Sequence, residues 1–177
     1  VEERYWEKDA DFLRRNPAAK VPVLRVDGMV MAESVAICEY LEECYPEPSL
    51  MPKTPEARYE VRRLIGWFDD KFHSEVTSKL LYERVNKKVM KLGFPDSTNV
   101  KAGAKAIKYH LDYMAWLLDH RRWLAGDVMT LGDFAAAAPS GANAGWRLSS
   151  PTAPASKKVS ISASEKSSSE SNSRVCA

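Results

Sequence analysis

The sequence predicts a small α/β unit followed by an all-α domain, and three observations support this prediction. A hairpin pattern between Lys20 and Glu33 leads directly into a helical pattern that starts at Ser34. Beyond a proline-rich segment, the apolar spacing changes to that of long helices. After Phe134 the apolar periodicity stops. With 177 residues, of which 45% are hydrophobic, the chain is long enough for one good core or two small ones.

The hairpin is predicted from the stretch KVPVLRVDGMVMAES, residues 20–34. Asp27-Gly28 separates two short apolar runs, and this pair favours a type I′ turn because both central residues of that turn need positive φ. Pro22 donates no backbone hydrogen bond, so it belongs at an edge, a strand start or a special turn. We therefore expect two antiparallel strands, preceded by a short helix over about residues 8–15.

The helix after the hairpin is expected to be capped by Ser34 and to close at Tyr45-Pro46. The prolines from 46 to 55 then form a linker. Two long helices should follow, one over about residues 55–88 and one after the loop GFPDSTN. Their apolar stripes are Val61, Leu64, Ile65, Phe68, Phe72, Val76 and Leu80 in the first, and Ala104, Ile107, Leu111, Met114 and Leu118 in the second.

A last helix start is predicted at MTLGDF. Thr130 and Asp133 are three residues apart, as in a capping box, and Met129 and Phe134 flank them as a hydrophobic staple. The segment from Pro139 to the end contains 12 serines in 39 residues and no apolar period, so we expect disorder from about Pro139.

Charge and apolar runs argue against several partners. The net charge of +2 comes from residues 139–177, because the first 138 residues carry −1. Basic pairs such as Arg14-Arg15 are scattered among acids, so no nucleic-acid partner is expected. No apolar run approaches the roughly 20 residues that span a bilayer, and no membrane partner is expected either.

Cysteine and histidine spacings predict no metal site. Three cysteines, without C-x-x-C spacing, favour reduced thiols: Cys38, Cys44 and Cys176. The histidines lack the i, i+4 spacing of a helical zinc pair and have no nucleophile motif nearby, so each is expected to be structural or on the surface: His73, His110 and His120.

The motifs NPAAKVPVL, ESVAICEYLEE, YPEPSLMP, RRWLAGD and TLGDF occur in an order that resembles the glutathione S-transferase family, over roughly residues 1–138. The resemblance implies a partial thioredoxin-like, glutathione-binding domain over residues 1–46 and a linker over 47–54. An all-α domain over 55–138 would contribute the site for an electrophile, and residues 139–177 form the serine-rich tail. It also implies a cytoplasmic protein that forms a homodimer at full length.

The resemblance assigns five glutathione-binding residues. Pro22 matches the family proline that is cis, which turns the backbone of Val21 toward the cysteinyl part of glutathione. Glu33 and Ser34, at a helix N-terminus, match the residues that hold the γ-glutamyl end. Lys20 is near enough in sequence to meet the glycyl carboxylate.

Two departures from the family limit the prediction of activity. The chain begins at VEERYW, which resembles the family's second strand, so the first strand and helix, with the Tyr, Ser or Cys that contacts the sulphur, are not in this sequence. The chain as given is therefore expected to be inactive, with Val21, Val23 and Val35 partly uncovered. The serine-rich tail also replaces the helices that follow TLGDF in the family.

Three functions remain open. The first is conjugation of glutathione to hydrophobic electrophiles. The second is a non-catalytic role, because the long helices are also similar to bacterial members that bind the tubulin-like filament of cell division. The third is a glutathione-dependent isomerase or reductase.

Overall fold

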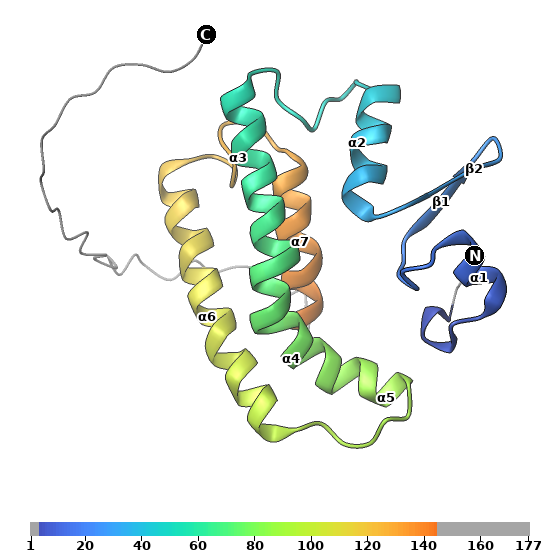
Figure 1. The fold of residues 1–177 in the computed structure, drawn as a ribbon. Coiled ribbons are helices and arrows are strands. Elements are labelled where there is room, and N and C mark those ends of the chain that lie inside the picture. Colours follow the sequence, from blue (N-terminus) through green and yellow to red (C-terminus); the bar gives the residue numbers. More distant parts are fainter. Residues whose placement is uncertain (1–3, 145–177) are drawn as a thin grey trace, which may run out of the picture. The chain divides into compact units, whose positions relative to one another are not determined.

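A β-hairpin and two short helices precede a bundle of long helices (Figure 1). The computed structural model describes residues 4–144, with side chains described for residues 4–140. The elements in chain order are the 3₁₀ turn η1 (Tyr5–Glu7), α1 (Ala10–Arg15), β1 (Val23–Val26), β2 (Met29–Ala32), α2 (Ser34–Cys44), α3 (Pro55–Gly66), η2 (Trp67–Thr77), α4 (Ser78–Leu81), η3 (Tyr82–Asn86), α5 (Lys87–Val89), α6 (Ser97–His120) and α7 (Leu131–Ala144). The predicted fold class, an α/β unit followed by an all-α domain, is confirmed.

The hairpin forms as its turn residues require. β1 and β2 pair antiparallel, with Val23 opposite Ala32 and Val26 opposite Met29. The two turn residues, Asp27 and Gly28, have φ of 48° and 86°. Both values are positive, as a type I′ turn needs.

The helix after the hairpin begins where predicted, but its N-cap residue is different. Ser34 is the first helical residue, and Glu33 occupies the N-cap position without a capping hydrogen bond from its side chain. The expectation that Ser34 caps the helix is therefore wrong. Because Glu33 alone separates β2 from α2, it takes up the change of chain direction with φ 71° and ψ 114°, a region that non-glycine residues rarely adopt.

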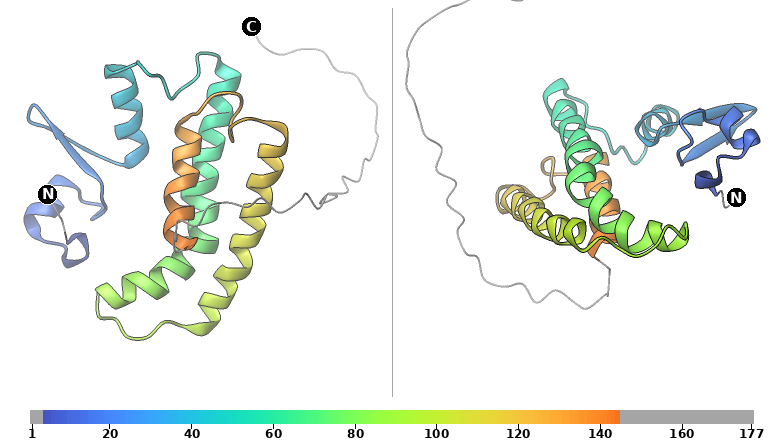
Figure 2. Two further views of the ribbon diagram at one scale, coloured as in Figure 1. Left: turned by 180° about the vertical axis from the view of Figure 1, so that it is seen from behind. Right: turned by 60° about the horizontal axis from the view of Figure 1, so that its bottom comes forward.

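The first long helix is confirmed along its whole predicted stripe. From Pro55 to Val89 the chain is helical throughout, and every residue of the stripe that begins at Val61 and ends at Leu80 is buried. In η2 and η3 the helix widens to i→i+5 hydrogen bonds. In both views of Figure 2, α7 and α6 lie beside this helix, whereas its α5 end extends beyond α7.

The residues at the centre of the buried face of α6 each precede a residue of the predicted stripe by one position. The fully buried residues of this helix are Gly103, His110 and Leu117, whereas Leu111 and Leu118 are 45% and 47% exposed. Gly103 permits the close approach, because a Cβ atom there would lie 2.8 Å from Leu80 Cγ. Ile107 and Met114 of the predicted stripe do pack against the core, so the prediction is wrong only for the centre of the buried face. An apolar-spacing rule gives no weight to a glycine or a histidine at that position.

His110 is the polar centre of this helix contact. Trp67 Nε1 donates to His110 Nδ1 at 3.1 Å, and His110 Nε2 lies 3.1 Å from Glu75 Oε2. Since Nδ1 accepts, the neutral ring carries its proton on Nε2 and donates it to the carboxylate. Burial lowers the pKa of His110, which Glu75 opposes. The expected structural role of this histidine is consistent with its complete burial.

The start of α7 has the predicted capping box. Thr130 N donates to Asp133 Oδ2 at 2.8 Å, and Gly132 N donates to Thr130 Oγ1 at 3.2 Å. Asp133 also accepts from Leu124 N at 2.9 Å, so it fixes the loop before the helix. Met129 and Phe134, the expected staple, are 40% and 50% exposed.

α7 continues through Ala144, with Pro139 inside it, so the expected loss of order at about Pro139 is wrong for residues 139–144. Alanine has the highest helix propensity, and four consecutive alanines precede this proline. The remainder of the expected disordered tail, residues 145–177, lies outside the described residues.

The predicted linker is attached to its neighbours. Glu42 of α2 accepts from the backbone amides of Leu50 and Met51, at 3.0 and 3.1 Å. Leu131 N donates to Leu50 O at 3.0 Å. A second core cluster, of Met51, Val61, Ile65 and Leu131, packs against Val35 and Cys38 of α2. These contacts fix α2 against the long helices.

The capping aspartate gives a first prediction. Asp133→Ala should lower the free energy of unfolding by about 1–3 kcal/mol, because a helix cap and a loop hydrogen bond are lost together. Chemical denaturation would measure this. Asp127→Ala is the control, since Asp127 is exposed. Equal stability of the two variants would contradict the capping role.

The buried histidine gives a second prediction. Because the folded-state pKa of His110 is lowered, the unfolded chain takes up the proton first as pH falls. The contribution of His110 to the free energy of unfolding should therefore be constant above the unfolded histidine pKa of about 6.5 and should decrease below it. His110→Gln should lower stability at neutral pH and flatten the profile between about pH 6.5 and 5. A pH profile that is the same in His110→Gln and in the wild type would contradict this prediction.

Candidate functional site

One hollow brings together all five residues assigned to glutathione binding. Its volume is about 520 Å³, and Lys20, Val21, Pro22, Glu33 and Ser34 line it. The opposite wall comes from the long helix and from α7, with Phe68, Asp69, His73, Thr77, Leu81, Ala138 and Pro139. We call this hollow the groove.

The loop that carries Lys20 and Val21 is held by Asn16, which the sequence analysis did not single out. Asn16 is buried, its Nδ2 donates to Lys20 O at 2.7 Å, and its Oδ1 accepts from Ala18 N at 3.1 Å. The Asn16 side chain thus holds the loop of residues 16–20 by hydrogen bonds to its backbone. The Asn16-Pro17 pair directly after α1 is the sequence signal for this loop.

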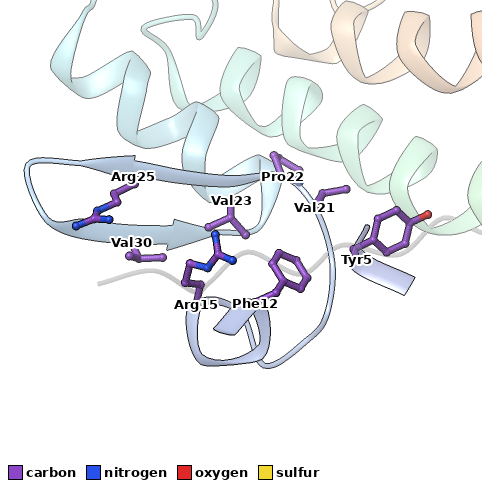
Figure 3. A pocket seen from close by; sticks show the side chains of 8 residues that line it. All are labelled: Tyr5, Phe12, Arg15, Val21, Pro22, Val23, Arg25 and Val30. Atoms are coloured by element: carbon purple, nitrogen blue, oxygen red, sulfur yellow. The ribbon is translucent and has the colours of Figure 1, made fainter. Parts of the chain in front are cut away.

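The Val21–Pro22 peptide bond is cis, as the resemblance implies. Val21 is 48% exposed, and both residues also line a second, larger hollow of about 770 Å³. Figure 3 shows Phe12 of α1 and Val23 and Val30 of the hairpin around this hollow. Val23 of the hairpin and Val35 of α2 are half-buried.

The helical wall of the groove is a stripe that sequence reasoning missed. Asp69, His73, Thr77 and Leu81 recur every four residues, so they share one side of the helix. This side is adjacent to the buried stripe of Phe68 and Phe72. The spacing of Asp69 and His73 was visible in the sequence, but only the fold shows that they face Glu33 and Ser34.

Asp69 is the residue of the groove lining whose pKa is shifted. Burial raises the pKa of its carboxyl, and the nearby charge of Glu33 raises it further, whereas His73 acts in the opposite direction. Glu33 and Asp69 therefore converge from two elements on one region. A cation, such as an ammonium group, would relieve their repulsion there.

An apolar hollow of about 260 Å³ adjoins the groove and shares Ser34, Asp69 and Pro139 with it. Its other lining residues are Val35, Cys38, Ile65, Leu131, Phe134, Ala135 and Ala138. Cys38 and Cys44 are free thiols, and Cys176 lies outside the described residues. Within residues 4–144, no cluster of three His, Cys, Asp or Glu side chains could hold a metal ion.

Known proteins are similar to this chain in sequence and in fold. Residues 1–44 match the family model of the glutathione S-transferase N-terminal domain. A glutathione S-transferase from Rhodospirillum rubrum F11 superposes with a TM-score of 0.78 at 47% identity, over 80% of this chain and 64% of that one. Residues 1–44 thus match a glutathione S-transferase N-terminal domain, and the described part of the chain has the sequence and fold similarity expected of that family.

Proteins whose names point to cell division are also similar to this chain. FtsZ-localized protein A of Caulobacter vibrioides is 43% identical over 139 residues, which are 76% of this chain and 61% of that protein. The structure of FzlA from C. crescentus has a TM-score of 0.76 at 40% identity, over 80% of this chain and 65% of that chain. This chain thus spans about three fifths of the curated relative.

The convergence of Glu33 and Asp69 in the groove gives a third prediction. Glu33→Gln should lower the pKa of Asp69 toward its ordinary value without restoring it fully, because burial remains. A carboxyl NMR titration would measure the shift. Glu43→Gln on the exposed side of α2 is the control and should leave Asp69 unchanged. An unchanged Asp69 in Glu33→Gln would show that the two groups do not interact.

Proposed function

We propose that this chain binds glutathione in the groove, and that the protein conjugates glutathione to hydrophobic electrophiles. The observation that carries the proposal is that five residues, assigned from sequence motifs as far apart as Lys20 and Ser34, line one hollow. The helix N-terminus at Ser34 offers backbone amides and a partial positive charge to the γ-glutamyl carboxylate.

The remaining parts of glutathione fit the other lining groups. Glu33 would meet the γ-glutamyl ammonium, and Asp69 adds a second carboxylate near it. Lys20 would meet the glycyl carboxylate. The backbone of Val21 would pair with the cysteinyl residue.

The adjoining apolar hollow supports a hydrophobic second substrate. It shares Ser34 and Asp69 with the groove, so an electrophile there would lie next to bound glutathione. Conjugation forms a bond from the glutathione sulphur to the electrophile, and either a leaving group departs or a proton is taken up. The thiol must first lose its proton, and a group that lowers its pKa from about 8.5 is the catalytic requirement.

A second candidate function is a non-catalytic role with the filament of bacterial cell division. The specific support is the 43% identity to a protein whose name states that it localises with FtsZ. In this role the groove would be a remnant or a regulatory site. The two functions share a fold, so the fold does not choose between them.

We also propose that the full-length protein is a cytoplasmic homodimer, as expected from the family resemblance. Within residues 4–144, no helix is long and apolar enough to cross a membrane.

The groove gives a fourth prediction. Ser34→Ala should weaken glutathione binding by about 1–3 kcal/mol, because a hydrogen bond to a charged group is lost at the helix N-terminus. Titration calorimetry would measure it. Ser78→Ala is a matched control, since the Ser78 hydroxyl donates to the Ser74 carbonyl on an exposed helix surface.

The wild-type chain and the Ser34→Ala variant would also distinguish the two proposed functions. Glutathione affinity that is equal in Ser34→Ala and in wild type would remove the groove from the proposal. Co-sedimentation with FtsZ filaments, without measurable glutathione binding, would favour the division-type role instead.

A further inference from the structure

We infer that the exposed end of the first long helix binds the surface of an anionic lipid membrane. We call this surface the basic tip, and it consists of Arg84, Val85, Lys88, Val89, Lys91, Leu92 and Phe94. The inference does not depend on glutathione or on the groove.

The charge of this region is strongly positive. Between residues 79 and 108 the sequence has eight Lys or Arg side chains and two acids, Glu83 and Asp96. Both acids interact with other groups of the protein and do not neutralise the cations of the basic tip. Glu83 is buried, pairs with Lys87 and accepts from Asn99 Nδ2 at 3.0 Å, and Asp96 caps α6. The cations of the basic tip, by contrast, make no ion pair with any described residue.

An apolar stripe runs beside these cations. Val85, Val89 and Leu92 are spaced by four and three residues, so they lie on one side of the helix end, and they are 45%, 53% and 57% exposed. Phe94 follows in the loop at 95% exposure. None of these four belongs to the two core clusters of the described residues. Arg84, Lys88 and Lys91 have the same spacing, one residue earlier.

This combination fits a membrane surface better than a protein or nucleic-acid partner. Phe94 is 95% exposed and projects from the surface. Such a side chain is suited to insert into a soft apolar layer, whereas it forms no pocket into which a partner's side chain could bind. Two of the three cations of the basic tip, Lys88 and Lys91, are lysines, whereas protein interfaces are enriched in Arg and depleted in Lys. Lipid headgroups attract Lys and Arg alike, and apolar side chains next to such cations insert at the acyl boundary.

The inference revises the expectation of no membrane partner, which rested on the lack of a spanning segment. A net charge of −1 over the first 138 residues also concealed this local excess of positive charge.

Vesicle co-sedimentation of the full chain tests the inference. The chain should bind vesicles of phosphatidylcholine mixed with phosphatidylglycerol in equal parts, should bind pure phosphatidylcholine far less, and should be released by salt. Lys88→Glu with Lys91→Glu should reduce partition by at least about tenfold. Leu92→Ser with Phe94→Ser should also reduce it, because insertion is lost.

Matched controls use exposed residues elsewhere. Lys53→Glu with Arg122→Glu should change binding less than the charge reversal in the basic tip, and Tyr59→Ser with Val128→Ser should leave it unchanged.

The variant Phe94→Trp adds a direct readout of insertion. Its fluorescence emission, compared with that of the wild-type chain, should shift to the blue on anionic vesicles only. The inference is wrong if anionic and neutral vesicles bind equally, or if immobilised poly-glutamate captures the chain while anionic vesicles do not. It is also wrong if the vesicle-bound Phe94→Trp variant shows no shift of the added tryptophan emission, because the inference requires insertion.

Discussion

Burial of one apolar stripe on the long helix from Pro55 to Val89 holds both the bundle and the groove in place. Phe68 and Phe72 fill the bundle core, whereas Val61 and Ile65 pack with Met51 and Leu131. Each buried side chain of this size stabilises the fold by about 1.5–3 kcal/mol. The stripe leaves the helix no freedom to rotate, so the adjacent side, with Asp69 and His73, is fixed toward the hairpin. The position of the groove wall is therefore a consequence of core packing.

Binding and catalysis place different demands on this groove. Contacts to the two ends of glutathione are the same before and during the reaction, so they favour binding without accelerating the chemical step. Acceleration needs a group near the sulphur that stabilises the thiolate. A transferase and a non-catalytic division protein could thus have the same groove and differ only at the sulphur. Glutathione affinity tests the groove, whereas turnover tests the enzyme.

Local signals explain what could be predicted from the sequence. The Asp27-Gly28 turn, the Thr130–Asp133 capping box and the stripe of the first long helix each depend on residues close together in the chain, and each is confirmed. The five groove residues were assigned by resemblance, and the structure brings them into one hollow. Their ligand remains a proposal.

Contacts between distant residues account for what could not be predicted. His110 is buried because Trp67 and Glu75 satisfy both ring nitrogens, and neither partner is recognisable from the spacing within α6. Asp69 and Glu33 are 36 residues apart, and only the fold brings both to the lining of one groove. The N-cap at Glu33 follows from the abrupt passage from strand to helix, which outweighed the capping preference of serine.

The wall of the groove and most of the basic tip belong to the same continuous helix. The groove wall ends at Leu81, and the first residue of the basic tip is Arg84, with Glu83 buried between them. The helix is continuous across this junction, and the hydrogen bonds from Asp96 N and Asn99 Nδ2 to Glu83 fix its end to the start of α6. A membrane that holds the basic tip would therefore set the orientation of the groove rather than its shape. Occupancy of the groove and attachment of the tip should then be nearly independent, because neither event requires the helix between them to change.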